Sequence, residues 1–91
     1  MRNDVEWRLT LGALLRAALD DAPANVHDVT AWTGRHRPLI EGALQRAPTD
    51  FDVEFVYHFL SDADIRVKDL KFRDFQVGQM RDLIGELIQH D

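Results

Sequence analysis

A basic run, Arg35-His36-Arg37, holds the side chains of this chain that are best suited to recognising an anion. Arginine presents a planar fork of N–H donors that fits a phosphate or the edge of a guanine base, and histidine can donate a hydrogen bond to a phosphate. Arg46 adds a further cation to the same segment, whereas Glu41 would accept from cytosine or repel a phosphate. The candidate DNA-contacting residues are therefore Arg35, His36, Arg37 and Arg46.

The sequence contains no set of residues that suits catalysis or metal binding as the basic run suits an anion. The chain has no cysteine, which excludes disulfides, thiol nucleophiles and cysteine-ligated metals. Ser61, the only serine, lacks a GxSxG turn, and no nucleotide-binding glycine loop occurs. The series Asp62, Asp64 and Asp69 lacks the glycine and the glutamate of a calcium loop, and the histidines form no HExxH pair. We expect neither enzymatic activity nor a metal or cofactor.

The segment from Val26 to Ala47, which carries the basic run, predicts two short helices joined by a turn. Asn25 can cap the first helix, whose apolar positions lead to Trp32, and Gly34 is expected to end it. Pro38 suits the first turn of the second helix, because its missing N–H would be unpaired there in any case.

This predicted pair resembles the helix-turn-helix domains of bacterial transcriptional regulators. The motif has glycine in the turn and branched apolar residues in the second helix, which Gly34, Ile40 and Leu44 match, while Thr30 and Thr33 depart from it. The resemblance is confined to residues 26–47. It implies that the second helix enters the major groove of duplex DNA with the basic run at its start.

The rest of the chain also predicts helices, so the expected fold class is all-α. Asn3 or Asp4 can cap a first helix with apolar residues at intervals of three and four, which should end before Pro23. A long C-terminal helix is expected over about residues 70–89. We expect a single helical domain over residues 1–91, a small bundle of four to five helices that contains the helix-turn-helix-like pair.

Residues 51–60 suit either a helix or a strand, because they are rich in β-branched and aromatic side chains. A hairpin over residues 51–72 would make the fold a winged helix, but the alternation of apolar residues breaks at Asp69. A helix places the apolar side chains on one wide face behind an acidic first turn, and we favour it. Ser61 would then cap a short helical turn over residues 62–67.

Acidic residues dominate the second half of the chain, which motivates a second hypothesis. The net charge is −5, and residues 48–91 carry five basic and ten acidic side chains. A second basic cluster alternates with aspartates, which predicts a solvated surface; it comprises Arg66, Lys68, Lys71 and Arg73. The alternative to a DNA-binding regulator is therefore an acidic interaction module, of the inhibitor, immunity or adaptor type, that binds a basic protein partner and no DNA.

Two further expectations concern assembly and location. Gly78 and Gly85 share a face of the C-terminal helix and could bring a second helix close, within the chain or in a homodimer. The N-terminus has acids where a signal peptide needs basic and then apolar residues, and no window is long and apolar enough to span a bilayer. We expect a cytoplasmic protein that does not contact a membrane.

Overall fold

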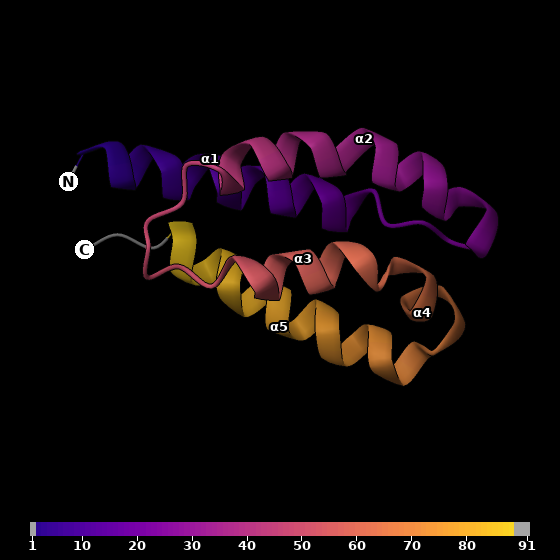
Figure 1. The fold of residues 1–91 in the computed structure, drawn as a ribbon. Coiled ribbons are helices and arrows are strands. Elements are labelled where there is room, and N and C mark those ends of the chain that lie inside the picture. The colour runs from indigo at the N-terminus through magenta and orange to yellow at the C-terminus, as the bar shows by residue number, and fades with distance from the viewer. Residues whose placement is uncertain (1, 89–91) are drawn as a thin grey trace.

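The computed structural model describes residues 2–88, and all of the regular structure in that range is helical (Figure 1). The elements are α1 (Arg2–Asp20), α2 (Val26–Leu44), α3 (Val53–Ser61), α4 (Ala63–Lys68) and α5 (Leu70–Ile88). The all-α fold class and the helix over residues 51–60 are confirmed, and the alternative hairpin over residues 51–72 does not form. The long C-terminal helix is confirmed as far as Ile88, while Gln89 lies outside the described residues.

The helices form a bundle with α1 in contact with two long neighbours. Helices α1 and α2 run antiparallel as a hairpin, and α3, α4 and α5 complete the bundle on the other side of it (Figure 1). Helix α1 packs against α2 and against α5, and the short α4 joins α2 to α5 at one end. The start of α1 and the end of α5 lie together at the opposite end (Figure 1).

Helix α2 differs from the sequence-based prediction, because it continues through Gly34 and Pro38 without a turn. The predicted turn at Gly34 is therefore wrong, and residues 26–44 do not form the helix-turn-helix-like pair. Glycine and proline inside a helix cost roughly 1 and 3 kcal/mol relative to alanine. Trp32 and Ile40 lie on either side of these two residues, and both side chains are fully buried. Burying a large apolar side chain contributes about 1.5–3 kcal/mol. A continuous helix gains both contributions because it places the two side chains on the same face.

Two tryptophans tie α1 to α2 by hydrogen bonds in opposite directions. The indole N–H of Trp7 in α1 donates to the carbonyl oxygen of Ala43 at 2.6 Å, and that of Trp32 in α2 donates to the carbonyl oxygen of Ala18 at 2.9 Å. Ala18 and Ala43 lie in the last turns of their helices, where carbonyl oxygens can accept further hydrogen bonds; Ala43 also accepts from the backbone N–H of Arg46 at 3.0 Å. The two bonds therefore satisfy buried donors and also set the register of the hairpin.

The core is continuous along the bundle and draws on every helix. Its members are Trp7, Leu11, Leu15, Ala18, Trp32, Ile40, Ala43, Leu44, Val56, Phe59, Leu60, Ala63, Met80, Ile84 and Leu87. The two largest side chains that are fully buried, Trp32 and Phe59, meet edge to face with ring centroids 6.0 Å apart. Trp32 is thus a core residue and not an exposed anchor for a partner.

Side-chain caps explain where three of the helices begin. Asn25 accepts from the backbone N–H of Asp28, as predicted, and Asp52 accepts from that of Phe55 at the start of α3. Asp69 caps α5 by accepting from the N–H of Phe72. The predicted cap at Ser61 is wrong, because Ser61 is the last residue of α3 and Asp62 precedes α4.

Only one glycine is required by a close helix contact within the described residues. A Cβ on Gly12 would lie 2.7 Å from Cγ2 of Ile88, where α1 crosses α5. A Cβ on Gly78 or Gly85 would meet nothing within 4 Å, so these glycines bring no other part of the described chain close. Their role in a homodimer stays a prediction.

Replacing Gly34 with alanine tests the continuous helix. The site has open space for a Cβ and no positive φ, so Gly34→Ala should raise the free energy of unfolding by about 0.5–1 kcal/mol through helix propensity. Urea denaturation followed by circular dichroism measures this. A turn at Gly34 with a left-handed glycine would instead make the same variant less stable than the parent.

The substitution Gly12→Ala gives the opposite result and serves as the matched control. The added methyl group collides with Ile88, and overpacking of this kind costs roughly 1–3 kcal/mol, which exceeds the propensity gain. The urea midpoint should fall for Gly12→Ala and rise for Gly34→Ala. Equal shifts for the two variants would contradict the α1–α5 crossing described above.

Candidate functional site

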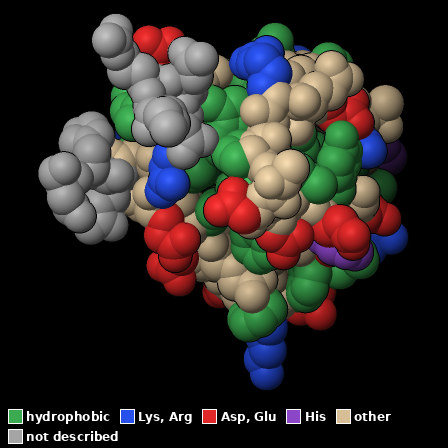
Figure 2. Space-filling view, turned by 60° about the vertical axis from the view of Figure 1, so that its left-hand side comes forward, with side chains coloured by type: hydrophobic (Ala, Val, Ile, Leu, Met, Phe, Trp, Pro, Cys, Tyr) green, Lys and Arg blue, Asp and Glu red, His purple; other side chains and the backbone are tan. Residues whose placement is uncertain are grey.

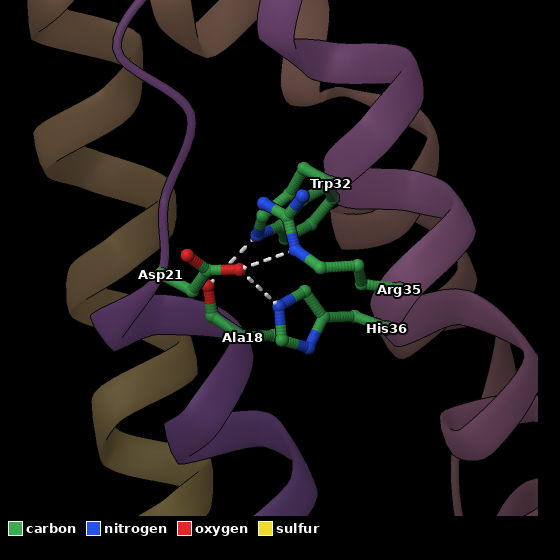
Figure 3. Close-up of polar contacts among 5 residues, drawn as sticks. All are labelled: Ala18, Asp21, Trp32, Arg35 and His36. Atoms are coloured by element: carbon green, nitrogen blue, oxygen red, sulfur yellow. Dashed lines mark hydrogen bonds and ion pairs between the residues drawn. The ribbon is translucent and has the colours of Figure 1, made fainter.

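Asp21, just after α1, engages two of the predicted DNA-contacting residues (Figure 3). Arg35 Nε donates to Asp21 Oδ2 at 2.9 Å, and His36 Nε2 lies 2.7 Å from the same oxygen. These hydrogen bonds, from His36 first and Arg35 second, lower the pKa of Asp21 below its ordinary value. The His36 side chain is only 14% exposed, so it fills the space between α1 and α2 and presents little surface to a ligand.

The other two predicted residues do not join this group. Arg37 Nε donates to Glu41 at 3.2 Å, and its guanidinium carbon lies 5.8 Å from the ring centroid of Tyr57. Arg46 donates to the carbonyl oxygen of Gly42 at 3.3 Å near the end of α2. The structure thus joins Arg35 and His36 through one carboxylate, whereas Arg37 and Arg46 form separate local contacts.

The second basic cluster does not lie entirely on the solvated surface. Arg73 is exposed and pairs with Asp74 at 3.0 Å, as interleaved charges predict. Arg66, in contrast, is only 6% exposed and is one of two buried polar residues within the described chain. The sequence analysis missed this buried cation, since a charge pattern along a short helix does not reveal which side faces the core.

An acidic groove lies at the end of the bundle where α1 begins and α5 ends. It has a volume of about 460 Å³ and lies between α1, residues 48–55 and α5. Its lining residues are Trp7, Arg8, Pro48, Asp50, Phe51, Asp52, Phe55, Gln79, Asp82, Leu83, Glu86 and Leu87. Figure 2 brings this end of the bundle forward and shows carboxylate side chains lying among apolar ones.

Aromatic rings line part of the acidic groove. Trp7 and Phe51 meet edge to face, with ring centroids 5.0 Å apart and planes at 83°. Trp7 is held by its bond to the Ala43 carbonyl, and Phe51 and Phe55 are half-buried beside it. The apolar part of the groove is therefore positioned by the core and keeps some exposed surface.

Four carboxylates and one arginine set the charge of the acidic groove. Asp52 is used as the cap of α3, and Arg8 Nη2 donates to the backbone oxygen of Glu86 at 2.8 Å. The carboxylates of Asp50, Asp82 and Glu86 are on exposed residues and form no ion pair or hydrogen bond within residues 5–88. Asp82 and Glu86 also repel each other as a like-charged i,i+4 pair, an arrangement that does not help the helix.

Comparisons of the sequence with family models and curated proteins, and of the fold with solved structures, give no match. Within the described residues, no group of three or more His, Asp or Glu side chains is placed to hold a metal ion. No described helix combines the length and apolar character needed to cross a bilayer. The acidic groove has more carboxylates than basic groups in its lining, so its charge favours a cation over an anion.

The Asp21 contacts lead to a pH-dependent stability difference. Because the pKa of Asp21 is lowered by folding, its carboxylate stabilises the fold above the ordinary value of 3.8, and this contribution is lost as the pH falls through the lower folded value. Asp21→Asn should therefore lower Tm at about pH 6 and have little effect near about pH 2.

The matched control for this prediction is Asp20→Asn. Asp20 is exposed at the same helix end and forms no ion pair within the described residues, so its replacement removes only the unfavourable interaction with the helix dipole. Thermal melts of the parent and both variants across this pH range separate the two effects. Parallel pH profiles for the two variants would show that the Asp21 contacts contribute nothing.

Proposed function

We propose that this protein is a helical interaction module that binds a basic, partly apolar segment of a protein partner in the acidic groove. The observation that carries the proposal is a set of three carboxylates around an aromatic surface that form no ion pair within residues 5–88: Asp50, Asp82 and Glu86. Carboxylates with no partner within residues 5–88 are available to a cationic ligand. Charge complementarity of this kind directs a partner to the site and raises the association rate.

The aromatic surface makes the expected partner more specific than a simple cation. Lysine and arginine have apolar stems that can lie along Phe51 and Phe55 while their charged ends reach the carboxylates. An arginine or lysine over an aromatic face gains a further cation–π attraction of about 0.5–1 kcal/mol at an exposed site. A segment that alternates basic with apolar residues satisfies both parts of the acidic groove.

The contacts of the basic run favour this proposal over recognition of DNA. Arg35 and His36 share Asp21, and Arg37 is paired with Glu41, so a phosphate or a base edge would have to displace a carboxylate to reach them. The continuous α2 helix also lacks the turn that would place the basic run at a helix start. DNA binding through Arg35, His36, Arg37 and Arg46 is the competing outcome of the test below.

Peptide binding to the full chain tests the proposal. The probe is a fluorescein-labelled peptide of alternating leucine and arginine, compared with the same peptide carrying glutamine for arginine. The variant Asp82→Asn with Glu86→Gln should weaken binding of the arginine peptide by about tenfold or more, since it removes two of the three unpaired charges. Raising the salt concentration should also weaken it. Fluorescence anisotropy measures both effects.

A second double variant serves as the control, because it changes the net charge by the same amount at residues outside the acidic groove. Asp20→Asn with Asp28→Asn neutralises two exposed carboxylates outside the acidic groove, and it should leave peptide affinity within about twofold of the parent. Equal losses in the two double variants would show that overall charge, and not the acidic groove, attracts the peptide. Salt-dependent retention of duplex DNA, lost on replacing Arg35 and Arg37 with alanine, would support the DNA alternative instead.

A further inference from the structure

A second pocket, which we call the arginine pocket, lies at the other end of the bundle. It is a cavity of about 250 Å³ between the end of α1, the loop after it, α2, α4 and the first half of α5. Its wall is mostly apolar and includes Trp32, Phe59 and Val77. Arg66 and Arg73 are the charged residues among the described side chains that line it, and none of those side chains is acidic.

Arg66 is held rigidly in the wall of the arginine pocket. Its Nη1 donates to the carbonyl oxygen of Phe59 and to Oε1 of Gln76, both at 2.5 Å. Its guanidinium carbon lies 4.1 Å from the ring centroid of Phe59 and 5.5 Å from that of Trp32. A side chain so constrained on one side presents its remaining donors in a fixed direction, which lowers the entropic cost of binding a ligand.

The remaining donors of Arg66, Nε and Nη2, have no hydrogen-bond partner within residues 5–88. No side-chain nitrogen or oxygen that is fully shut off from solvent lacks a partner in the described chain, so these two nitrogens keep some exposure to solvent. Arg66 is one of the residues that line the arginine pocket. Together, Nε and Nη2 form one edge of the guanidinium fork, whose two parallel N–H groups match the two oxygens of a carboxylate.

The charge of Arg66 has no carboxylate within ion-pair distance among residues 5–88. Asp62 accepts a hydrogen bond from Gln76 Nε2 at 3.0 Å. Asp62, and to a smaller extent Asp64, attract Arg66 through space and raise its pKa, but burial outweighs them. Burial lowers the pKa of Arg66 to about 10, which leaves the side chain charged at neutral pH. A buried charge without a direct partner is costly, and a bound anion would offset that cost.

We propose that the arginine pocket binds a small carboxylic acid with an apolar body. The carboxylate accepts two hydrogen bonds from Nε and Nη2 of Arg66, and the apolar body contacts Trp32, Phe59 and Val77. The cavity is smaller than the roughly 300–1,000 Å³ typical of drug-sized ligands, so it suits a short chain or a single ring. Arg73 also lines the pocket, but it is paired with Asp74, so Arg66 supplies the charge that binds the carboxylate. This inference uses residues outside the acidic groove and does not depend on the proposed function.

Isothermal titration calorimetry on the full chain with octanoate tests this inference. Octanamide has the same chain without the charge, and acetate has the charge without the chain, so each isolates one half of the proposed contact. Octanoate should bind at least about tenfold more tightly than either. Equal binding of octanoate and octanamide, equal binding of octanoate and acetate, or no heat with millimolar octanoate would each overturn the proposal.

Two variants assign the binding to the arginine pocket. Arg66→Met removes the charge, and Ala22→Phe places a ring in the pocket from an exposed residue, so the second variant keeps its fold if the first does not. Each folded variant should bind octanoate at least about tenfold more weakly than the parent. The double variant Asp82→Asn with Glu86→Gln is the control and should bind it as the parent does. Unchanged affinity in Ala22→Phe would overturn the assignment.

Discussion

The reciprocal hydrogen bonds of Trp7 and Trp32 are the constraint on which the rest of the structure depends. Each indole is buried and must find an acceptor, because an unsatisfied buried donor costs roughly 1–3 kcal/mol. Each finds a carbonyl in the last turn of the opposite helix, which fixes how far α1 and α2 slide past one another. With that register set, Ile40 also reaches the core, and its burial favours a helix that continues through Gly34 and Pro38.

The same two tryptophans connect the core to the two proposed binding sites, the acidic groove and the arginine pocket. Trp7 contributes to the wall of the acidic groove, and Trp32 contributes to the wall of the arginine pocket. The longest dimension of the protein is 41 Å, and charges in water are largely screened beyond about 8 Å at physiological ionic strength. The proposed binding of a cationic segment in the acidic groove and of an anion in the arginine pocket can therefore coexist at opposite ends of one small acidic bundle.

The sequence predicted the helices well where capping side chains and the spacing of apolar residues determine them. The cap at Asn25 and the long final helix depend on a side chain and a periodicity that lie within a few residues. The helix at residues 51–60 follows from the same periodicity, despite β-branched and aromatic side chains that suit a strand. The predicted turn at Gly34 is wrong for the converse reason. The burial of Trp32 and Ile40 depends on the other helices and favours a continuous α2 despite the glycine and the proline.

The sequence by itself determined the helical fold class, the acidic second half and the absence of cysteine chemistry. Only the tertiary structure decided the surroundings of the charged side chains. It pairs Asp21 with Arg35 and His36, buries Arg66, and gives Asp82 and Glu86 no partner within residues 5–88. The physical reason is the range of the forces. Capping and periodicity act within a helix turn, whereas the burial and pairing of a charge depend on helices that are distant in the chain and meet only when the core forms.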